Sequence, residues 1–360
     1  MSRRPWHPLA VGALIGAVTL LLLVGLLATG GFDVGAALSA LVRGAVGSPS
    51  AFVSGTLVRA TPLLLAGLAV AVAFEAGVLN IGAEGQLLAG ATATTAVALA
   101  LPLGALTLPV ALAAGALAGA AWAAVAAMLR QRFGVLEVIS AIMLNFVAQF
   151  AVAWLVRGPL QESTHIYPQS STLPLIAQLP VLVPGTRLHW GFALAVVAAI
   201  AIWFVIRHTA TGFRLRTVGA NPFAAASAGR IDAIRIAFGA FVVSGALAGL
   251  AGAVEVSGVT YALYENLSPG YGYSAIAVAL LARLDARLIV ASAVLFGGLE
   301  AGGVAMQRDA AVPSVVVSVV EAMLILMMLS AGRLRGRSWQ GGDGGAAAIT
   351  ADPATLVASR

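Results

Sequence analysis

The chain has 360 residues, of which 60% are hydrophobic and only 9% are charged, and this balance excludes an ordinary water-soluble domain. It has no cysteine, which excludes disulfides and thiolate metal sites, and no lysine, which excludes a Walker A ATPase loop because that loop needs a lysine on the phosphates. The formal net charge of +6 comes from arginines in short loops between apolar runs, so membrane topology explains the charge better than nucleic-acid binding does.

Long apolar runs recur along the whole chain, each near the ~20 residues that a helix needs to cross a bilayer. They predict an all-α fold, a polytopic transmembrane helical bundle of about ten spans. Pairs of glycines four residues apart, Gly115 with Gly119 and Gly245 with Gly249, predict close helix packing. We expect the spans near 9–29, 52–74, 85–101, 108–129, 136–156, 189–206, 234–255, 271–282, 288–305 and 313–331.

The arginines between these spans predict the orientation of the chain. If the N-terminus is cytoplasmic, fifteen arginines fall inside and only five fall outside, which satisfies the positive-inside rule and puts both termini in the cytoplasm. The five outside are Arg43, Arg59, Arg157, Arg187 and Arg308.

Two regions lie outside the apolar core of this scheme. The external loop from Arg157 to Leu188 is rich in Pro, Ser, Thr and Gln, and it is either a docking surface for an extracytoplasmic partner or a plain connector. The domain boundary is expected near residue 333, with a transmembrane domain at 1–333 and a disordered cytoplasmic tail at 334–360.

The first interruption of the apolar pattern is the segment 74–86, which holds three glycines and several polar residues. A broken helix or a tight re-entrant turn fits it, with Asn80 and Glu84 capping the freed backbone amides. Glu75, Asn80, Glu84 and Gln86 are then candidates for a polar translocation path or its gate. The other interpretation is a cytoplasmic hairpin whose polar residues face water.

The second interruption opens the span after Arg132. Glu137, Ala141, Asn145 and Gln149 follow at intervals of four residues and so share one helical face. The helix dipole alone accounts for Glu137 in the first turn. Asn145 and Gln149 lie deeper, and they either bond to other helices or contact a polar solute in the path.

The third segment, 207–235, is the longest internal loop. Its centre predicts a short helix with Asn221 as the N-cap, Pro222 at the first position and Gly229 as the stop. So short a helix is marginal alone in water, and packing against a partner through Phe223 would stabilise it. The alternative, an amphipathic helix on the bilayer, lacks a broad apolar face.

These three segments, in this order, resemble the inner-membrane permeases of ABC importers of the ribose, simple-sugar and nucleoside type, with the nucleoside branch most similar. The resemblance covers about residues 55 to 330. Relatives commonly have Gly-Phe-Asp-Gly where this chain has Gly272-Tyr273-Ser274-Ala275, so an acid is missing here. The motifs that carry the resemblance lie at 75–86, 137–145, 219–229, 244–252 and 275–281.

The resemblance implies how such a chain works. The loop at 219–229 would be the coupling helix to separate ATP-binding cassette ATPase subunits. A second permease chain, identical or related, and an extracytoplasmic solute-binding lipoprotein would complete the importer in a prokaryotic cell membrane, moving a nucleoside or simple sugar without a cofactor or catalytic residues in this chain. The coupling residues implied are Gly219, Asn221, Pro222, Phe223, Ala225, Ala228 and Gly229.

Two other function classes compete with this interpretation. An ion-coupled secondary transporter would use glutamates near the spans, but it gives the capped helix at 221–229 no role. An intramembrane enzyme would need a catalytic or metal constellation, and four histidines near span ends or termini do not provide one. The glutamates that would serve the transporter are Glu75, Glu84, Glu255, Glu300 and Glu321.

Overall fold

The fold is a bundle of α-helices. The computed structural model describes residues 8–313, 315–316, 318–319, 322–323 and 327, and this part of the chain contains no β-strand beyond isolated bridges. A π-helical turn, Ala51–Leu57, precedes α3, and another, Val256–Thr260, follows α10. The helices are α1 (Pro8–Thr29), α2 (Val34–Val46), α3 (Val58–Glu75), α4 (Ala83–Ala100), α5 (Thr107–Phe133), α6 (Glu137–Val156), α7 (Trp190–His208), α8 (Ala210–Ala220), α9 (Pro222–Gly229), α10 (Ala233–Glu255), α11 (Tyr271–Leu281) and α12 (Ala286–Ala310).

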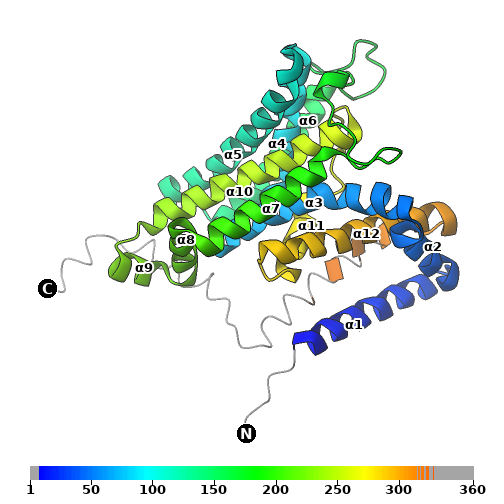
Figure 1. The fold of residues 1–360 in the computed structure, drawn as a ribbon, viewed down its shortest axis with the longest axis horizontal. Helices are drawn as coiled ribbons and strands as arrows, with labels where there is room; N and C mark the ends of the chain where they lie inside the picture. Colours follow the sequence, from blue (N-terminus) through cyan, green and yellow to red (C-terminus); the bar gives the residue numbers. More distant parts are fainter. Residues whose placement is uncertain (1–7, 314, 317, 320–321, 324–326, 328–360) are drawn as a thin grey trace, which may run out of the picture.

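Helix α3 is the centre of the bundle. Every residue from Ala60 to Ala73 is buried, because α3 packs against α10 on one side and against α11 and α12 on the other (Figure 1). Helices α4 and α5 pack against α10 and against each other, while α1 lies at the edge of the bundle beside α2 (Figure 1). Because α3 is buried on all sides, it is apolar all round and has no polar face.

Glycines bring α4, α5 and α10 into close contact. A Cβ on Gly119 would lie 2.3 Å from the carbonyl oxygen of Gly245, and one on Gly249 would lie 2.4 Å from the carbonyl oxygen of Gly115. Backbones this close leave no room for a side chain, so the predicted pairing of small residues is confirmed.

Within the residues that the structure describes, six helical stretches are long and apolar enough to cross a membrane. The predicted bundle of spans is therefore confirmed as an architecture, although α11, with 11 residues, is only about 17 Å long and cannot cross alone. Helix α2 was not predicted, because a 13-residue helix is too short to register as a span. The six stretches are Ala51–Glu75, Gly104–Phe133, Glu137–Val156, Trp190–His208, Ala233–Thr260 and Ala286–Ala310.

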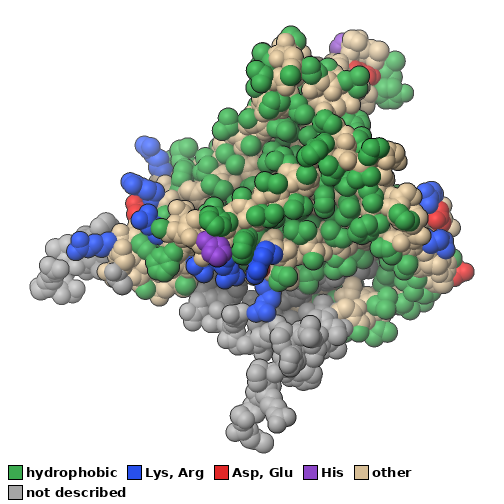
Figure 2. All heavy atoms as spheres, viewed as in Figure 1, with side chains coloured by type: hydrophobic (Ala, Val, Ile, Leu, Met, Phe, Trp, Pro, Cys, Tyr) green, Lys and Arg blue, Asp and Glu red, His purple; other side chains and the backbone are tan. Residues whose placement is uncertain are grey.

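Charged side chains gather at opposite ends of the molecule, and the band between them is apolar (Figure 2). One end, here called the α9 end, carries α8, α9 and the start of α12. The other, the loop end, carries the long loop 157–189. The predicted last span at 313–331 lies largely outside the described residues, and so does the tail at 334–360.

Candidate functional site

The apolar helix α3 ends at Glu75, and the chain runs through 76–82 before α4 begins at Ala83. We call 76–82 the first break. Gly77 has a φ of +75°, a left-handed conformation that turns the chain and that glycine adopts without strain. The predicted interruption between two helices is confirmed, and Asn80, Glu84 and Gln86 are buried instead of facing water as the hairpin interpretation requires.

Asn80 holds the first break in place from inside the protein. Its side chain is completely buried and forms a reciprocal amide pair with Gln86, at 2.8 and 3.0 Å. It also donates to the Ser244 hydroxyl at 2.7 Å and accepts from the Gly82 backbone N–H at 3.0 Å. Asn80 therefore caps the freed backbone as predicted, and it joins the first break to α10.

Asn145, on α6, bonds to the first break and to the start of α4. Its Oδ1 accepts from the Gly85 backbone N–H at 2.8 Å, and its Nδ2 donates to the Ile81 carbonyl at 3.0 Å. The same nitrogen lies 3.3 Å from the Tyr273 hydroxyl. One amide thus links α6, the first break and α11.

Glu84 does not cap the first break, and this part of the prediction is wrong. Its carboxylate accepts from the Gly272 backbone N–H at 2.7 Å, so it caps α11, 188 residues further along the chain. A Cβ on Gly272 would lie 2.2 Å from the Glu84 backbone nitrogen. The N-termini of α4 and α11 therefore meet, and the carboxylate offsets the partial positive charge of the α11 end.

A polar cavity of about 270 Å³ lies where these two N-termini meet. Of the residues predicted for a solute path, Glu84, Asn145 and Gln149 line it. Much of the remaining wall comes from 261–270, the second break, between the π-helical turn after α10 and the start of α11. The wall residues not predicted from the sequence are Leu88, Glu265, Asn266, Ser268, Pro269, Gly270 and Tyr273.

A sequence signal for the second break was present. Polar residues and a Pro-Gly pair interrupt the apolar pattern at 265–270, as the glycines and polar residues do at 74–86. The apolar run at 271–282 hides this signal, because the run has nearly the composition of a complete span.

An ion pair stands at the rim of the cavity. The Arg157 guanidinium, at the end of α6, donates two hydrogen bonds to the Glu265 carboxylate, the longer of them at 3.1 Å. These bonds hold the pKa of the Glu265 carboxyl below its usual value. The pair joins α6 to the second break at the loop end of the molecule.

The other predicted path residues lie away from the cavity wall. Asn80 and Gln86 form the buried network behind it, and Glu75 lies at the far end of α3, within electrostatic range of Arg207 and Arg216. Glu137 makes an ion pair with Arg130 at 2.7 Å. This ion pair, in addition to the helix dipole, accounts for a carboxylate at the start of α6.

The loop 157–189 packs onto the second break. The Ser170 N–H donates to the Leu263 carbonyl and the Leu173 N–H to the Tyr261 carbonyl, both at 2.8 Å. The loop is therefore bonded to a segment that leads into the cavity.

The predicted short helix of the third segment is confirmed as α9. The Asn221 side chain accepts from the N–H groups of Phe223 and Ala224 at 3.0 Å, and Pro222 is the first helical residue. The stop differs from the prediction, because Gly229 is still helical and Arg230 takes the left-handed conformation, with a φ of 50°.

The surface of α9 is largely open. The Phe223 side chain is 54% exposed and Ala225 is buried, while the side chain of Ala228 lies outside the described set. Gly219 lies at the end of α8 against α3 rather than on the open surface of α9.

No three His, Asp or Glu side chains lie close enough to hold a metal ion in the part of the chain that the structure describes. The side chains that line the cavity can form hydrogen bonds through their amides, their hydroxyls and two carboxylates.

The chain matches a family model described as branched-chain amino acid transport system / permease component over residues 52–329. It is 40% identical over 285 residues to the glucose ABC transporter permease protein TsgB13 of Haloferax volcanii, covering 76% of this chain and 75% of that one. It is 38% identical over 334 residues to the guanosine ABC transporter permease protein NupP of Bacillus subtilis, covering 91% of each. It is 32% identical over 284 residues to the nucleoside ABC transporter permease protein NupB of Lactococcus lactis, covering 76% and 78%. No solved structure gives a significant match.

Proposed function

Because the chain belongs to the family of permease components of branched-chain amino acid transport systems, we propose that it forms the solute path of an ATP-driven importer for a nucleoside or simple sugar. It is a multi-pass membrane protein and an ABC transporter permease of a prokaryote. The solute class rests on the glucose, guanosine and nucleoside permeases that the chain resembles.

The observation that carries the proposal is a polar cavity that opens on the surface of an apolar bundle. Polar side chains within a membrane cost free energy unless they are bonded or line water, so a cavity lined by amides, hydroxyls and carboxylates marks a route for a polar solute. The cavity lies where two helices are broken, as in transporters whose solutes bind at discontinuous helices. Glu84, Asn145 and Gln149 are the predicted residues placed to contact the solute.

We assign the α9 end to the cytoplasm, because more arginines lie on that side. Both termini then lie in the cytoplasm as well, and the chain has about ten complete or partial spans. The chain has no cysteine, so single cysteines can be labelled specifically. A membrane-impermeant maleimide should label Ser163→Cys, in the exposed loop, on intact cells, and Ser227→Cys, on α9, only after permeabilisation. The reverse pattern would overturn the orientation.

A second permease chain completes the path in this proposal. Gln149, Asn266 and Tyr273 line the cavity and are exposed on the surface of a single chain. Polar groups on a lipid-facing surface are costly, so a second chain would cover them. Size analysis of the purified complex, with differently tagged copies of this chain, would distinguish an identical from a related partner.

Two further partners dock at opposite ends. The open surface of α9, with Phe223 exposed, suits a cytoplasmic ATPase subunit. The loop 157–189 suits an extracytoplasmic solute-binding lipoprotein because its bonds to the second break connect such a partner to the cavity.

The test is uptake into proteoliposomes that contain the purified importer. Accumulation of labelled guanosine or glucose should require ATP, the ATPase subunits and the binding protein together. Uptake by this chain alone, driven by an ion gradient, would contradict the proposal and favour a secondary transporter.

A further inference from the structure

The end of α8 touches the first break backbone to backbone. A Cβ on Gly219 would lie only 2.0 Å from the Glu75 carbonyl oxygen, and one on Gly77 would lie 3.2 Å from the Gly219 Cα. No side chain separates these two segments. Any displacement of α8 must therefore displace the end of α3, because packed interiors have little free volume to absorb it.

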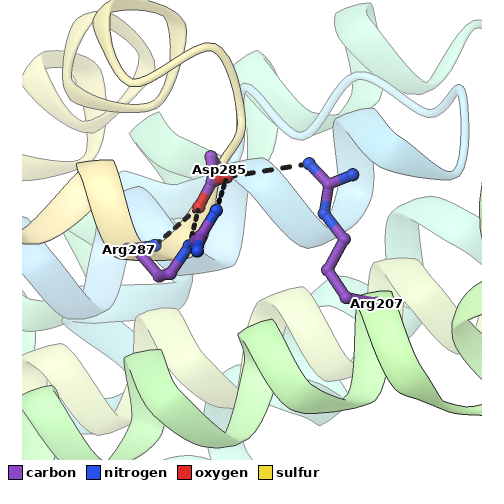
Figure 3. Close-up of polar contacts among 3 residues, drawn as sticks. All are labelled: Arg207, Asp285 and Arg287. Atoms are coloured by element: carbon purple, nitrogen blue, oxygen red, sulfur yellow. Dashed lines mark hydrogen bonds and ion pairs between the residues drawn. The ribbon is translucent and has the colours of Figure 1, made fainter.

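The neighbouring end of α7 contacts the loop after α11. Figure 3 shows Arg207 reaching from α7 toward Asp285, with an N–O distance of 3.7 Å. Arg287 bonds the same carboxylate at 3.0 Å, and its guanidinium lies 5.2 Å from the centre of the Trp203 ring on α7. The Asp285 carboxylate thus links the loop to α7, and the cation–π contact of Arg287 links the start of α12 to α7.

The backbone of this loop is held in an uncommon conformation. Arg283 and Leu284 have φ values of 54° and 63°, in the left-handed region that side chains other than glycine rarely adopt. Such residues persist where their surroundings hold them. The contacts of Asp285 with Arg207 and Arg287 are placed to do this.

The two segments touched by α7 and α8 both lead to the cavity. The first break continues into α4, which carries Glu84, and α11 runs back from the Asp285 loop to Gly272, whose N–H bonds Glu84. We call residues 207–220 the α7–α8 corner. The corner is followed directly by α9, since Asn221 is the only residue between α8 and α9.

We propose that Gly219 and Asp285 are positioning residues that transmit movement of α9 to the two broken helices at the cavity. Gly219 acts on α4 through the Glu75 backbone, and Asp285 acts on α11 through Arg207. The α7–α8 corner then moves both cavity walls together. This inference depends on the proposed docking of an ATPase at α9.

The test compares variants by the number of solute molecules moved per ATP hydrolysed, measured in the same proteoliposomes. Gly219→Ala should lower this ratio at least tenfold, because the new methyl group forces α8 away from Glu75. Asp285→Asn should lower it about threefold, and Asp285→Glu, which keeps the charge, should stay within twofold of the wild type.

Two matched controls should leave the ratio unchanged. Gly239→Ala adds a Cβ in α10 with nothing within 4 Å, and Asp309→Asn breaks an exposed ion pair with Arg308 at the loop end. Copurification of the ATPase shows whether each variant assembles.

An unchanged ratio in an assembled Gly219→Ala complex would overturn the proposal. If that variant does not assemble, an unchanged ratio in Asp285→Asn overturns it instead. A wild-type chain that needs no ATPase would refute the proposed function before any variant is compared.

Discussion

The first break and the second break meet at Glu84, but they are built differently. In the first break, Asn80 is fully buried and each of its polar atoms bonds to protein. The second break turns Glu265, Asn266 and Ser268 toward the cavity, and Asn266 is exposed.

The difference separates two uses of polar residues in a membrane. A polar group that is bonded within the protein fixes the shape of a broken helix, whereas one that faces a cavity is available to a solute. Asn80 and Gln86 therefore belong to the scaffold of the cavity wall, and so does Ser268, whose hydroxyl accepts from the backbone N–H groups of Gly270 and Tyr271. Asn266 belongs to the surface of the cavity. The predictions below test this division.

The largest effect is expected for Asn80→Ala. It leaves the Gln86 amide, the Ser244 hydroxyl and the Gly82 N–H short of a partner in the interior, which should lower the free energy of unfolding by about 3 kcal/mol. Chemical denaturation in detergent measures the change. A stability equal to wild type would show that the first break does not depend on this amide.

Gly272→Ala tests the junction between the two breaks. Its Cβ would lie 2.2 Å from the Glu84 backbone nitrogen, and overpacking of this kind should cost about 2 kcal/mol. The control is Gly298→Ala in α12, where the nearest atom is 3.6 Å away and no loss is expected. Equal stability of the two variants would contradict a close approach of α4 and α11.

Asn266→Ala tests the surface of the second break. Because its side chain is exposed, stability should stay within about 0.5 kcal/mol of wild type. Loss of one hydrogen bond to the solute, about 1 kcal/mol, should lower solute uptake about fivefold. A stability loss as large as that of Asn80→Ala would erase the distinction between the two breaks.

The smallest effect concerns pH, at the other end of α11. Hydrogen bonds from Arg287 hold the pKa of the Asp285 carboxyl below its usual value. The stabilisation from the ionised carboxylate is then complete above about pH 4, which is the pKa expected for this group in the unfolded chain. It is lost only as the pH falls through the lower pKa of the folded protein. The stability difference between wild type and Asp285→Asn should accordingly be constant from pH 5 to 8.

That constancy can be measured by denaturation at several pH values. A difference that shrinks between pH 8 and pH 6 would show that Asp285 is not held in its ionised form.

Short patterns of neighbouring residues in the sequence determined much of the helical structure of this protein. The long apolar runs, the glycine pairs of α5 and α10 and the Asn-Pro start of α9 are properties of neighbouring residues. The structure confirms the glycine pairs and the start of α9, and it confirms six of the predicted runs as helical stretches long enough to cross a membrane. The interruption at 74–86 was likewise visible, because glycines and polar residues cannot continue a membrane helix without cost.

The partners of those residues were decided only by the tertiary structure. Asn80 bonds Ser244, 164 residues away, and Glu84 caps Gly272 instead of its own break, because the ends of α4 and α11 meet. A sequence pattern shows that a buried polar group needs a partner, but packing selects the partner. The cavity wall at 261–270 and the contact of Gly219 with Glu75 come from the same long-range packing.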